Sequence, residues 1–383
     1  MASRTVLVLV RPASHVRMSA IARFARAQGW HLMFADRLSR LPIGWTGDGA
    51  LVTVRGEGVL PFVAGLRRRR VPVVDLTFDH PEVKVPRACA DHRACGRLAA
   101  EHLLSRHFTH AAWVSTTWSH SHALRAAGFS DAWRAATGRT PPRGILSQSM
   151  DARAFDDWRL FTRHLGGRLA RAPRPLGVLA YDDADAQRVL AAAETVRLRV
   201  PEDVAIVGIG NDELVCEHQT VPLTSVDHDI GRTGTAGAAL LARLMAGARA
   251  KPAPDLVLVR PRGVVARAST DMVAARDPLV RRALDDMRAH LADAFGSVEL
   301  ARALAVSRTR LDRAFAADLG SSVQKELARM RIDEARHLLA APDRPIADVA
   351  RRVGFSSPAY FSSAFRAATG LSPRAYRKSA GGT

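Results

Sequence analysis

Short apolar runs and longer periodic stretches alternate along the first two thirds of the chain. Runs rich in β-branched residues include TVLVLV, GALVTV, VPVVDLT, RGILSQS and DVAIVGIGND, and apolar residues recur at helical spacing over residues 18–28, 95–105 and 231–245. Apolar strands that alternate with helices are typical of a parallel sheet covered on both faces. These units are too many for one sheet of ordinary size, so we expect an α/β domain with two lobes.

The pattern changes after residue 267. A polar passage, ASTDMVAARDP, ends at Pro278, and beyond it every periodic segment has the spacing of a helix. We therefore predict an α/β domain over residues 1–270, a linker over residues 271–278 and an all-α domain over residues 279–383.

The all-α part contains an internal repeat. The segment LARALAVSRTRLDRAFAADLGSS, residues 300–322, is similar to VARRVGFSSPAYFSSAFRAATGLS, residues 349–372. Each copy predicts a short helix, a tight turn and a second helix that begins after an N-capping serine, Ser307 or Ser357. Pro358 then takes the first helical position, where a missing N–H costs nothing. A long helix over residues 323–339, roughly 25 Å in length, joins the copies.

A short helix, a turn and a second helix predict a helix-turn-helix motif, whose second helix enters the major groove of double-stranded DNA. The pairs Leu311 with Phe315 and Phe361 with Phe365 have i,i+4 spacing and should face the core. The candidate DNA-contacting residues are Ser307, Arg308, Thr309, Arg310 and Arg313 in the first copy, and Arg352, Ser357, Ser362, Ser363 and Arg366 in the second.

The two copies differ in what they offer to DNA. Arginine can bind guanine O6 and N7 in a bidentate manner, so most direct base reading should fall to Arg308, Arg310 and Arg313. The second copy would rely on serine hydroxyls, methyl contacts and DNA shape, with phosphates held by Arg351, Arg352 and Arg366. A small helical bundle without DNA-binding activity is the alternative interpretation.

Charge supports a polyanionic partner only in part. The formal net charge is +19 and the pI is about 11.3, which favours nucleic acid. Only four of the 56 basic residues are lysines, a bias that GC-rich coding would also produce. The positions of the arginines therefore matter more than the total.

The sequence indicates no membrane segment, disulfide framework or metal site. The first apolar run, residues 5–10, ends at Arg11 and is too short for a secretory or membrane segment, so we expect a cytoplasmic protein without a membrane partner. Cys89, Cys95 and Cys216 have no CxxC or zinc-ligand spacing, and we expect reduced cysteines that serve in packing. No cofactor is indicated.

Residues 279–378 resemble the AraC family of transcription regulators. Its C-terminal signature is visible in ADVARRVGFSSPAYFSSAFRAATGLSPRAYR. The resemblance implies a homodimeric regulator that binds an operator or promoter and acts as an activator, with RNA polymerase as a further partner. The chain departs from the family at Ala359 and Ser363, where the family commonly has a polar or basic residue.

Most of residues 1–267 resembles the LacI-type, periplasmic-binding-protein-like sensors. The segments that carry the resemblance are CADHRACGRLAAEHLLSRHF, LRAAGFSDAW, GVLAYDDADAQRVL and VPEDVAIVGIGNDE. The resemblance implies a two-lobed fold that binds a small effector between the lobes, and we expect a pentose-like sugar. The family frequently has aspartate where this chain has Gly210, so Asn211 and Asp212 take over its hydrogen bonds or the effector differs.

The resemblance also implies effector-contacting positions. Carboxylates, amides and the arginine fork suit vicinal hydroxyls. Trp118 would cover an apolar sugar face or belong to the core, Asp183 would contact the effector or cap the next helix, and Asp75 is a weaker candidate. The candidate effector-binding residues are Asp91, Trp118, Arg125, Asp182, Asp183, Asn211 and Asp212.

These observations together predict a sugar-responsive regulator, with two alternatives left open. The chain could respond to a different small molecule or act as a repressor. A sugar-active enzyme is the alternative of a different class, because doubly wound sheets also carry enzymes. However, GxSxG, GxxxxGK[ST] and HExxH motifs are absent. His120 and His122 lie near Ser119 and Ser121 in what we expect to be a loop, and we interpret them as solvent-facing or effector-contacting.

Overall fold

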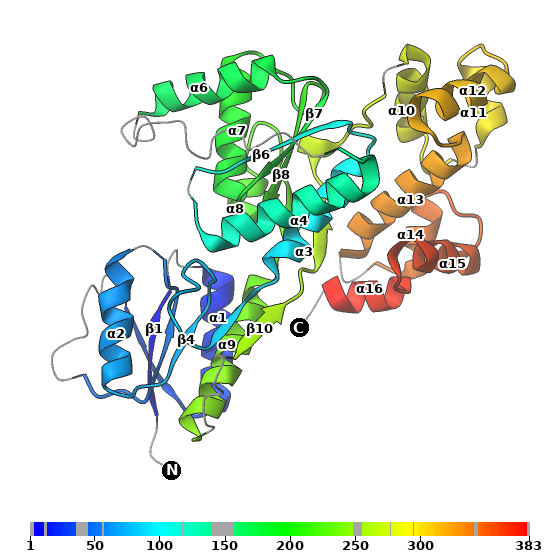
Figure 1. The fold of residues 1–383 in the computed structure, drawn as a ribbon. Helices are drawn as coiled ribbons and strands as arrows, with labels where there is room; N and C mark the ends of the chain where they lie inside the picture. Colours follow the sequence, from blue (N-terminus) through cyan, green and yellow to red (C-terminus); the bar gives the residue numbers. More distant parts are fainter. Residues whose placement is uncertain are drawn as a thin grey trace. The chain divides into compact units, whose positions relative to one another are not determined.

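Figure 1 shows the fold of the computed structural model. It describes residues 4–10, 14–35, 45–55, 57–116, 118–139, 157–247, 255–275, 277–293, 295–340 and 344–380. The chain divides into two compact units, unit 1 with residues 1–104 and 110–270, and unit 2 with residues 105–109 and 271–383. The predicted strand RGILSQS, residues 143–149, lies outside the described residues.

Unit 1 consists of two lobes, and lobe A contains a six-stranded sheet in the order β10-β5-β4-β3-β1-β2. Neighbouring strands run parallel, with Leu7 opposite Ala50. Val6 and Val8 pack under α1 and α9, whereas Leu7 and Leu9 pack under α2, so both faces are covered as predicted. The elements are β1 (Thr5–Leu9), α1 (His15–Ala27), β2 (His31–Phe34), β3 (Gly49–Val52), η1 (Glu57–Val59), α2 (Leu60–Arg68), β4 (Val73–Asp75), β5 (Arg87–Ala90), α9 (Ile230–Met245) and β10 (Leu256–Val259).

Lobe B contains a five-stranded sheet in the order β11-β9-β8-β7-β6. Its pairs are parallel except for β11 with β9, which is antiparallel; the prediction of a wholly parallel arrangement is wrong at this edge strand. The elements are α3 (His92–Leu104), β6 (His110–Val114), α4 (His120–Thr137), α6 (Trp158–Arg171), β7 (Leu176–Ala180), α7 (Asp183–Thr195), β8 (Val204–Ile209), α8 (Glu213–Cys216), β9 (Thr224–Asp227), β11 (Gly263–Val265) and η2 (Ala268–Thr270).

The chain passes between the lobes three times. Strand β5 of lobe A leads into α3, which packs on lobe B; β9 of lobe B leads into α9, which packs on lobe A; and β10 leads into β11. Asp91 and His92 lie at the first crossing, and His228 and Asp229 at the second. The carboxyl ends of the parallel strands of both lobes meet near these crossings, where ligands bind in open α/β folds.

Unit 2 is helical and has two separate cores. Helices α10 to α12 and the first half of α13 enclose one, and the second half of α13 with α14 and α15 encloses the other. Leu327 and Met330 of α13 belong to the first core, and Ile332, Ala335 and Leu339 to the second. The helices are α10 (Pro278–Ala289), α11 (Ser297–Ala303), α12 (Arg308–Leu319), α13 (Val323–Ala340), α14 (Ile346–Arg352), α15 (Pro358–Thr369) and α16 (Pro373–Ala380).

Residues 105–109, between α3 and β6, belong to unit 2. His107 Nε2 lies 3.0 Å from Glu326 Oε1 on α13, and the backbone N–H of Ala274 donates to the carbonyl of Arg106 at 2.8 Å. Burial alone would raise the pKa of Glu326, but the hydrogen bond from His107 and the charge of Arg329 outweigh it and lower that pKa to about 2. Unit 2 is thus assembled from two separate stretches of chain.

Candidate functional site

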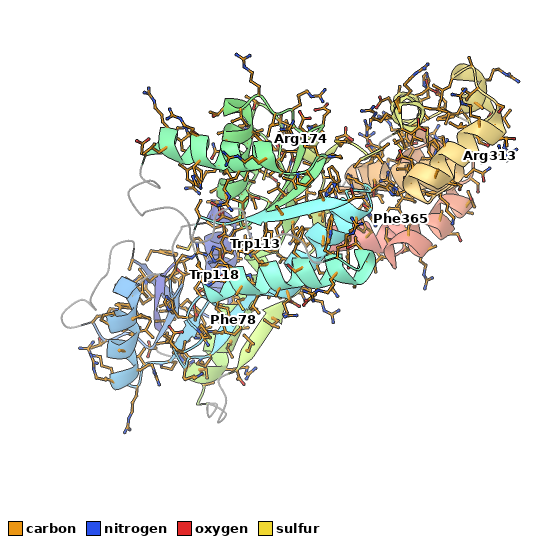
Figure 2. All side chains as sticks on the ribbon, turned by 45° about the horizontal axis from the view of Figure 1, so that its top comes forward. Phe78, Trp113, Trp118, Arg174, Arg313 and Phe365 are labelled. Atoms are coloured by element: carbon orange, nitrogen blue, oxygen red, sulfur yellow. The ribbon has the colours of Figure 1, made fainter. Side chains whose placement is uncertain are left out.

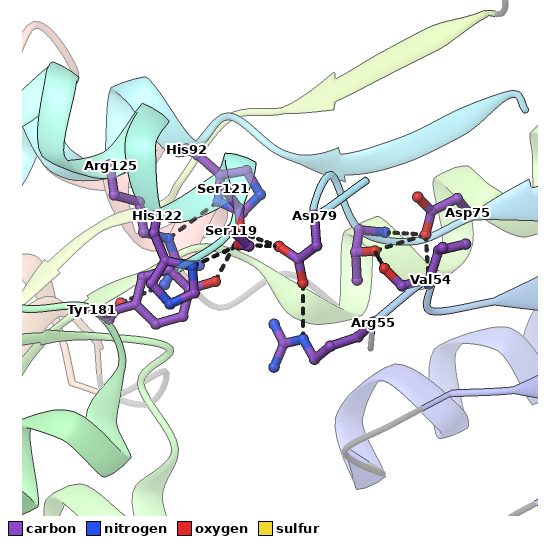
Figure 3. Close-up of polar contacts among 11 residues, drawn as sticks. Val54, Arg55, Asp75, Asp79, His92, Ser119, Ser121, His122, Arg125 and Tyr181 are labelled. Carbon is purple, nitrogen blue, oxygen red and sulfur yellow. Dashed lines mark hydrogen bonds and ion pairs between the residues drawn. The ribbon is translucent and has the colours of Figure 1, made fainter. Parts of the chain in front are cut away.

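Polar side chains from both lobes meet beside the crossings, and we call this group the interlobe site (Figure 3). Lobe A contributes Arg17 from the first turn of α1, Arg55 beyond β3 and Asp79 beyond β4. Lobe B contributes Ser119, Ser121, His122 and Arg125 around the start of α4, with Tyr181 beyond β7, while His92 and His228 lie at the crossings.

Asp79 joins the lobes through hydrogen bonds. Its Oδ2 atom accepts from Arg55 Nε at 2.9 Å, and its Oδ1 atom accepts from the hydroxyl of Ser119 at 2.7 Å and from that of Ser121. Burial would raise the pKa of Asp79, but the charge of Arg55 and the two serine hydroxyls outweigh it and lower that pKa. The ionised carboxylate therefore connects the loop beyond β4 with the first turn of α4.

His122 and Tyr181 form the lobe B wall of the interlobe site. The two rings stack, and the hydroxyl of Ser121 lies 2.9 Å from the Tyr181 hydroxyl. Burial and the charge of Arg125 lower the pKa of His122 to about 3. His120 and His122 lie in the first turn of α4, so the prediction of a loop at these residues is wrong.

Arg125 lies in the middle of the site and is buried. Its Nε atom donates to His92 Nδ1 at 3.2 Å, another nitrogen donates to the carbonyl of Tyr181, and its Cζ atom lies 4.2 Å from the centre of the Tyr181 ring. Neither hydrogen-bond acceptor carries a negative charge.

Two glycines set the position of Arg125. A Cβ atom at Gly96 would lie 2.0 Å from the carbonyl oxygen of Arg125, and one at Gly128 would lie 2.1 Å from that of Arg93. Helices α3 and α4 cross at backbone contact here because both positions lack a side chain. The close crossing brings Arg125 within hydrogen-bonding distance of His92.

Three buried nitrogens at the interlobe site have no hydrogen-bond partner among the described residues: Arg17 Nε, His92 Nε2 and His228 Nδ1. The side chains of Arg17 and His92 are each about 8% exposed. Burying a polar group without a partner costs free energy. These nitrogens therefore point to a group that the described residues do not supply.

Several predicted effector-binding residues also serve the local fold. Asp91 accepts from the N–H of Ala94, Asp182 from that of Asp185 and Asp212 from that of Leu214, so each caps a helix. Asp91 and Asp182 remain partly accessible.

Asp183 and Asn211 are engaged within lobe B. Asp183 is buried and accepts from the hydroxyl of Ser225 and the N–H of Asp212, so the alternative that it caps the next helix is wrong. Asn211 Oδ1 accepts from Arg267 at 2.9 Å.

The structure gives a reason for Gly210. This residue has φ of +150°, and a Cβ atom there would lie 2.6 Å from Asp183 Oδ2. The Asp183 carboxylate occupies the space that a side chain at position 210 would need. This carboxylate belongs to Asp183, the first residue of α7.

Two candidates fall outside the centre of the site. Trp118 is 53% exposed and its ring lies 5.7 Å from that of Trp113 (Figure 2), so the alternative that it belongs to the core is wrong. Asp75 is fully buried and accepts from Val54, Thr77 and Arg87. It stabilises the loop that follows β4.

The second helices of the two repeats are capped and packed as predicted. Ser307 accepts from the N–H of Arg310 at 3.2 Å, and Ser357 accepts from that of Tyr360 at 3.4 Å. The inward pairs, Leu311 with Phe315 and Phe361 with Phe365, are fully buried. This packing fixes which side of each helix faces outward.

In the first copy, all five candidate DNA-contacting residues are exposed: Ser307, Arg308, Thr309, Arg310 and Arg313. Arg308 pairs with Asp312 one turn further on, at 3.5 Å. Arg313 lies on the outer side of α12 (Figure 2). A hollow of about 450 Å³, lined by Arg308, Lys325 and neighbouring residues, adjoins this helix.

In the second copy, Arg352, Ser363 and Arg366 are exposed. The hydroxyl of Ser362 donates to the carbonyl of Pro358 at 2.9 Å within α15, and Ser357 is occupied by its cap. Of its three candidate serines, Ser363 is the one with a hydroxyl that makes no hydrogen bond among the described residues.

Within the described ranges, no helix is long and apolar enough to cross a membrane. Over the same part of the chain, no three His, Cys, Asp or Glu side chains are arranged to hold a metal ion. The three cysteines are free and buried, and burial raises the pKa of each thiol, to about 12 for Cys89 and Cys216 and about 11 for Cys95.

Comparison with known proteins matches both parts of the chain. Residues 100–270 match a periplasmic binding protein-like domain, and residues 300–379 match a helix-turn-helix domain. Over 235 residues the chain is 29% identical to the xylose operon regulatory protein of Escherichia coli K12, which covers 61% of this chain and 59% of that protein. Over 102 residues it is 39% identical to the arabinose operon regulatory protein of the same organism, covering 26% and 35% of the two chains. The matches thus span less than two thirds of these relatives.

Solved structures share the fold. The xylose-binding transcription activator xylR aligns over 99% of this chain and 98% of its own, with a TM-score of 0.60 and 22% identity. A complex of the transcriptional regulator CelR with cellobiose aligns over 70% of this chain and 86% of its own, with a TM-score of 0.57 and 23% identity. The chain therefore contains a periplasmic binding protein-like domain and a helix-turn-helix domain, and over 61% of its length it resembles the xylose operon regulatory protein.

Proposed function

We propose that this protein is a sugar-responsive transcription regulator that activates an operon for the use of a pentose such as xylose. The observation that carries the proposal is the interlobe site, where Asp79 of lobe A, which pairs with Arg55, accepts hydrogen bonds from Ser119 and Ser121 of lobe B. A ligand that competes for these contacts binds the open and closed arrangements of the lobes with different affinity. That difference in affinity is what shifts a two-state equilibrium.

The proposed effector contacts come from both lobes. Arg125 and Arg55 donate to hydroxyls, the accessible carboxylates of Asp91 and Asp182 accept from them, and Trp118 covers an apolar sugar face. Three other candidates do not contact the effector directly in this proposal, because their side chains already make hydrogen bonds within lobe B: Asn211, Asp183 and Asp212.

Double-stranded DNA is the proposed partner of unit 2. Arg308, Arg310 and Arg313 of the first copy read bases, while Arg352 and Arg366 of the second hold phosphates. Two observations support these assignments: the arginine side chains are exposed, and the helices that carry Arg308 and Arg366 begin at capping serines. The regulator acts in the cytoplasm as a homodimer, with RNA polymerase as a partner in activation.

The sensor half is tested by thermal melting of the full-length protein with a panel of pentoses and hexoses. A sugar that binds only the folded state raises the melting temperature. Arg55→Gln should weaken the shift, because it removes the donor to Asp79 and to the effector, while Arg68→Gln, at an exposed position of α2, should leave it unchanged. A panel in which no sugar raises the melting temperature contradicts the proposal.

The DNA half is tested by fluorescence anisotropy with promoter DNA from the regulated operon at fixed salt. Arg313→Ala should weaken specific binding by roughly tenfold or more, since a bidentate arginine–guanine contact contributes about 1–3 kcal/mol. Arg282→Ala removes the same charge from an exposed position of α10 and serves as the control. Equal losses in both variants would mean that α12 supplies charge and does not read sequence.

A promoter–reporter assay with and without sugar separates activation from repression. Rising expression supports the activator, and derepression supports the alternative. The alternative of a sugar-active enzyme receives no support from the relatives described above, which are regulators.

A further inference from the structure

We propose that the effector carries an anionic group, a carboxylate or a phosphate, which Arg17, His92 and His228 bind beside Arg125. The inference rests on the proposed sugar-sensing function and specifies its ligand as a sugar acid or a sugar phosphate. It comes from the unpartnered donors and the imbalance of charge at the interlobe site.

Two of the unpartnered nitrogens must be donors. Arg125 Nε donates to His92 Nδ1, so that ring nitrogen accepts and the proton of neutral His92 lies on Nε2. His92 Nε2 and Arg17 Nε thus each present an N–H without an acceptor among the described residues. Neither group can accept a hydrogen bond there from a sugar hydroxyl. The missing ligand atoms are therefore acceptors.

The charges at this end of the site are mainly positive. Burial and the charges of Arg125, Arg17 and Arg55 lower the pKa of His228 to about 3, so three arginines lie within electrostatic reach of this ring. Burial and the charge of Arg55 lower the pKa of Arg17 to about 10, and the charge of Asp75 only partly opposes them. Of the three arginines, only Arg55 has a carboxylate in hydrogen-bonding contact within the described residues.

The nearby carboxylates are already engaged. Asp75 pairs with Arg87 and Asp79 with Arg55. Asp91 and Asp182 accept from helix N–H groups, and Asp227 accepts from the N–H of Asp229. Among the described residues, the buried guanidinium of Arg17 therefore has no hydrogen-bonded counter-ion, which is an unfavourable arrangement for a buried charge.

The packing of Arg17 keeps its position fixed. A Cβ atom at Gly234 of α9 would lie 3.0 Å from the carbonyl oxygen of Arg17 and 3.1 Å from its Cγ atom. The glycine leaves room for the stem of the side chain between α1 and α9. A buried, positioned guanidinium within electrostatic reach of the His228 ring matches the oxygens of a carboxylate or phosphate.

Thermal melting of the full-length protein tests the proposal with D-xylose, D-xylonate, D-xylose 5-phosphate and inorganic phosphate at matched ionic strength. We expect xylonate or the sugar phosphate to bind about tenfold tighter than xylose, the ratio expected for one charge-assisted hydrogen bond. Whichever of xylonate and xylose 5-phosphate binds more tightly identifies the anionic group as a carboxylate or a phosphate. Stabilisation by inorganic phosphate equal to that by the sugar phosphate would overturn the proposal of a sugar-bearing effector.

Substitutions test whether Arg17 and His228 cause the tighter binding of the anionic ligand. Arg17→Gln should remove most of the advantage of the anionic ligand, and Arg23→Gln, an exposed arginine on the same helix, should retain it. If Arg17→Gln fails to fold, His228→Asn serves instead. It replaces the imidazole without changing the formal charge, and it should reduce the ratio of the affinity for the anionic ligand to that for xylose.

Two outcomes separate the failure of this inference from that of the proposed function. If xylose binds as tightly as both anions, the anionic assignment is wrong and the sugar-responsive function stands. If no sugar, acid or phosphate shifts the melting temperature, both are wrong.

Discussion

His122 and His228 occupy surroundings that disfavour a protonated ring. Burial and the charge of Arg125 lower both pKa values to about 3. In the unfolded chain each ring would take up a proton near pH 6.5. The unfolded state therefore binds more protons than the folded state between about pH 6.5 and pH 3, and unit 1 loses stability as the pH falls through this window.

The melting temperature of unit 1 should accordingly fall between pH 7 and pH 5. The limiting slope is about 1.4 kcal/mol per pH unit for each such histidine. Tryptophan fluorescence isolates unit 1, because all six tryptophans lie at residues 30–158. His122→Asn should flatten the profile, whereas His164→Asn, at an exposed position of α6, should not. A profile that stays flat in the unaltered protein contradicts this account.

At the same scale, sequence reasoning identified only part of the interlobe site. Arg125, a candidate effector-binding residue, lies at this site, but Arg17, Asp79 and His228 were not predicted. Asp79 and His228 follow the ends of β4 and β9 closely, which is a usable signal, whereas Arg17 lies inside α1 and has no such signal. The pattern could not distinguish Asp75 from Asp79, because the difference depends on Thr77 and Arg87, which hold Asp75 inside lobe A.

At the scale of elements, the start of helix α4 was not predicted from the sequence. Helix α4 begins at His120, yet Ser119 makes no capping hydrogen bond to it. Its hydroxyl instead contacts Asp79 and His122. A serine therefore precedes α4 as it precedes α12 and α15, but only the hydroxyls of Ser307 and Ser357 cap their helices as predicted.

The crossing of α3 and α4 gives a prediction about stability. Gly96→Ala places a methyl group 2.0 Å from a backbone carbonyl, which must push the helices apart at a cost of about 1–3 kcal/mol or more. Gly167→Ala on α6 is the matched control, since nothing lies within 4 Å of its Cβ position, and it should stabilise by about 0.4–1 kcal/mol.

Chemical denaturation followed by tryptophan fluorescence measures both changes. Gly96→Ala should also weaken effector binding more than its loss of stability explains, because Arg125 moves relative to His92. Similar unfolding midpoints for the two alanine variants would show that the crossing is not constrained by backbone contact.

At the scale of the whole molecule, unit 2 depends on a distant piece of the chain. No sequence pattern assigned residues 105–109 to it, because a short connection between a helix and a strand resembles any other loop. The assignment becomes visible only through tertiary contacts such as that of His107 with Glu326.

His107→Ala should therefore destabilise unit 2. Glu326 has a side chain only 4% exposed, and the loss of one charge-assisted partner should cost about 1–3 kcal/mol. Circular dichroism follows the helices of both units and tryptophan fluorescence follows unit 1 alone, so the change should appear in the circular dichroism transition and not in the fluorescence transition. Arg329 still pairs with Glu326, so folding should survive. An unchanged helical transition would mean that residues 105–109 contribute nothing to unit 2.

Helix α13 belongs to two cores at once, and this sets a rotational phase between the two DNA-reading motifs. One residue added between Met330 and Ile332 would turn the second motif by about 100° around the helix axis and advance it by about 1.5 Å. Exposed side chains on α12 and α15 can change without disturbing either core. The spacing between the two helix-turn-helix motifs cannot change in the same way, because the pitch of one continuous helix fixes it.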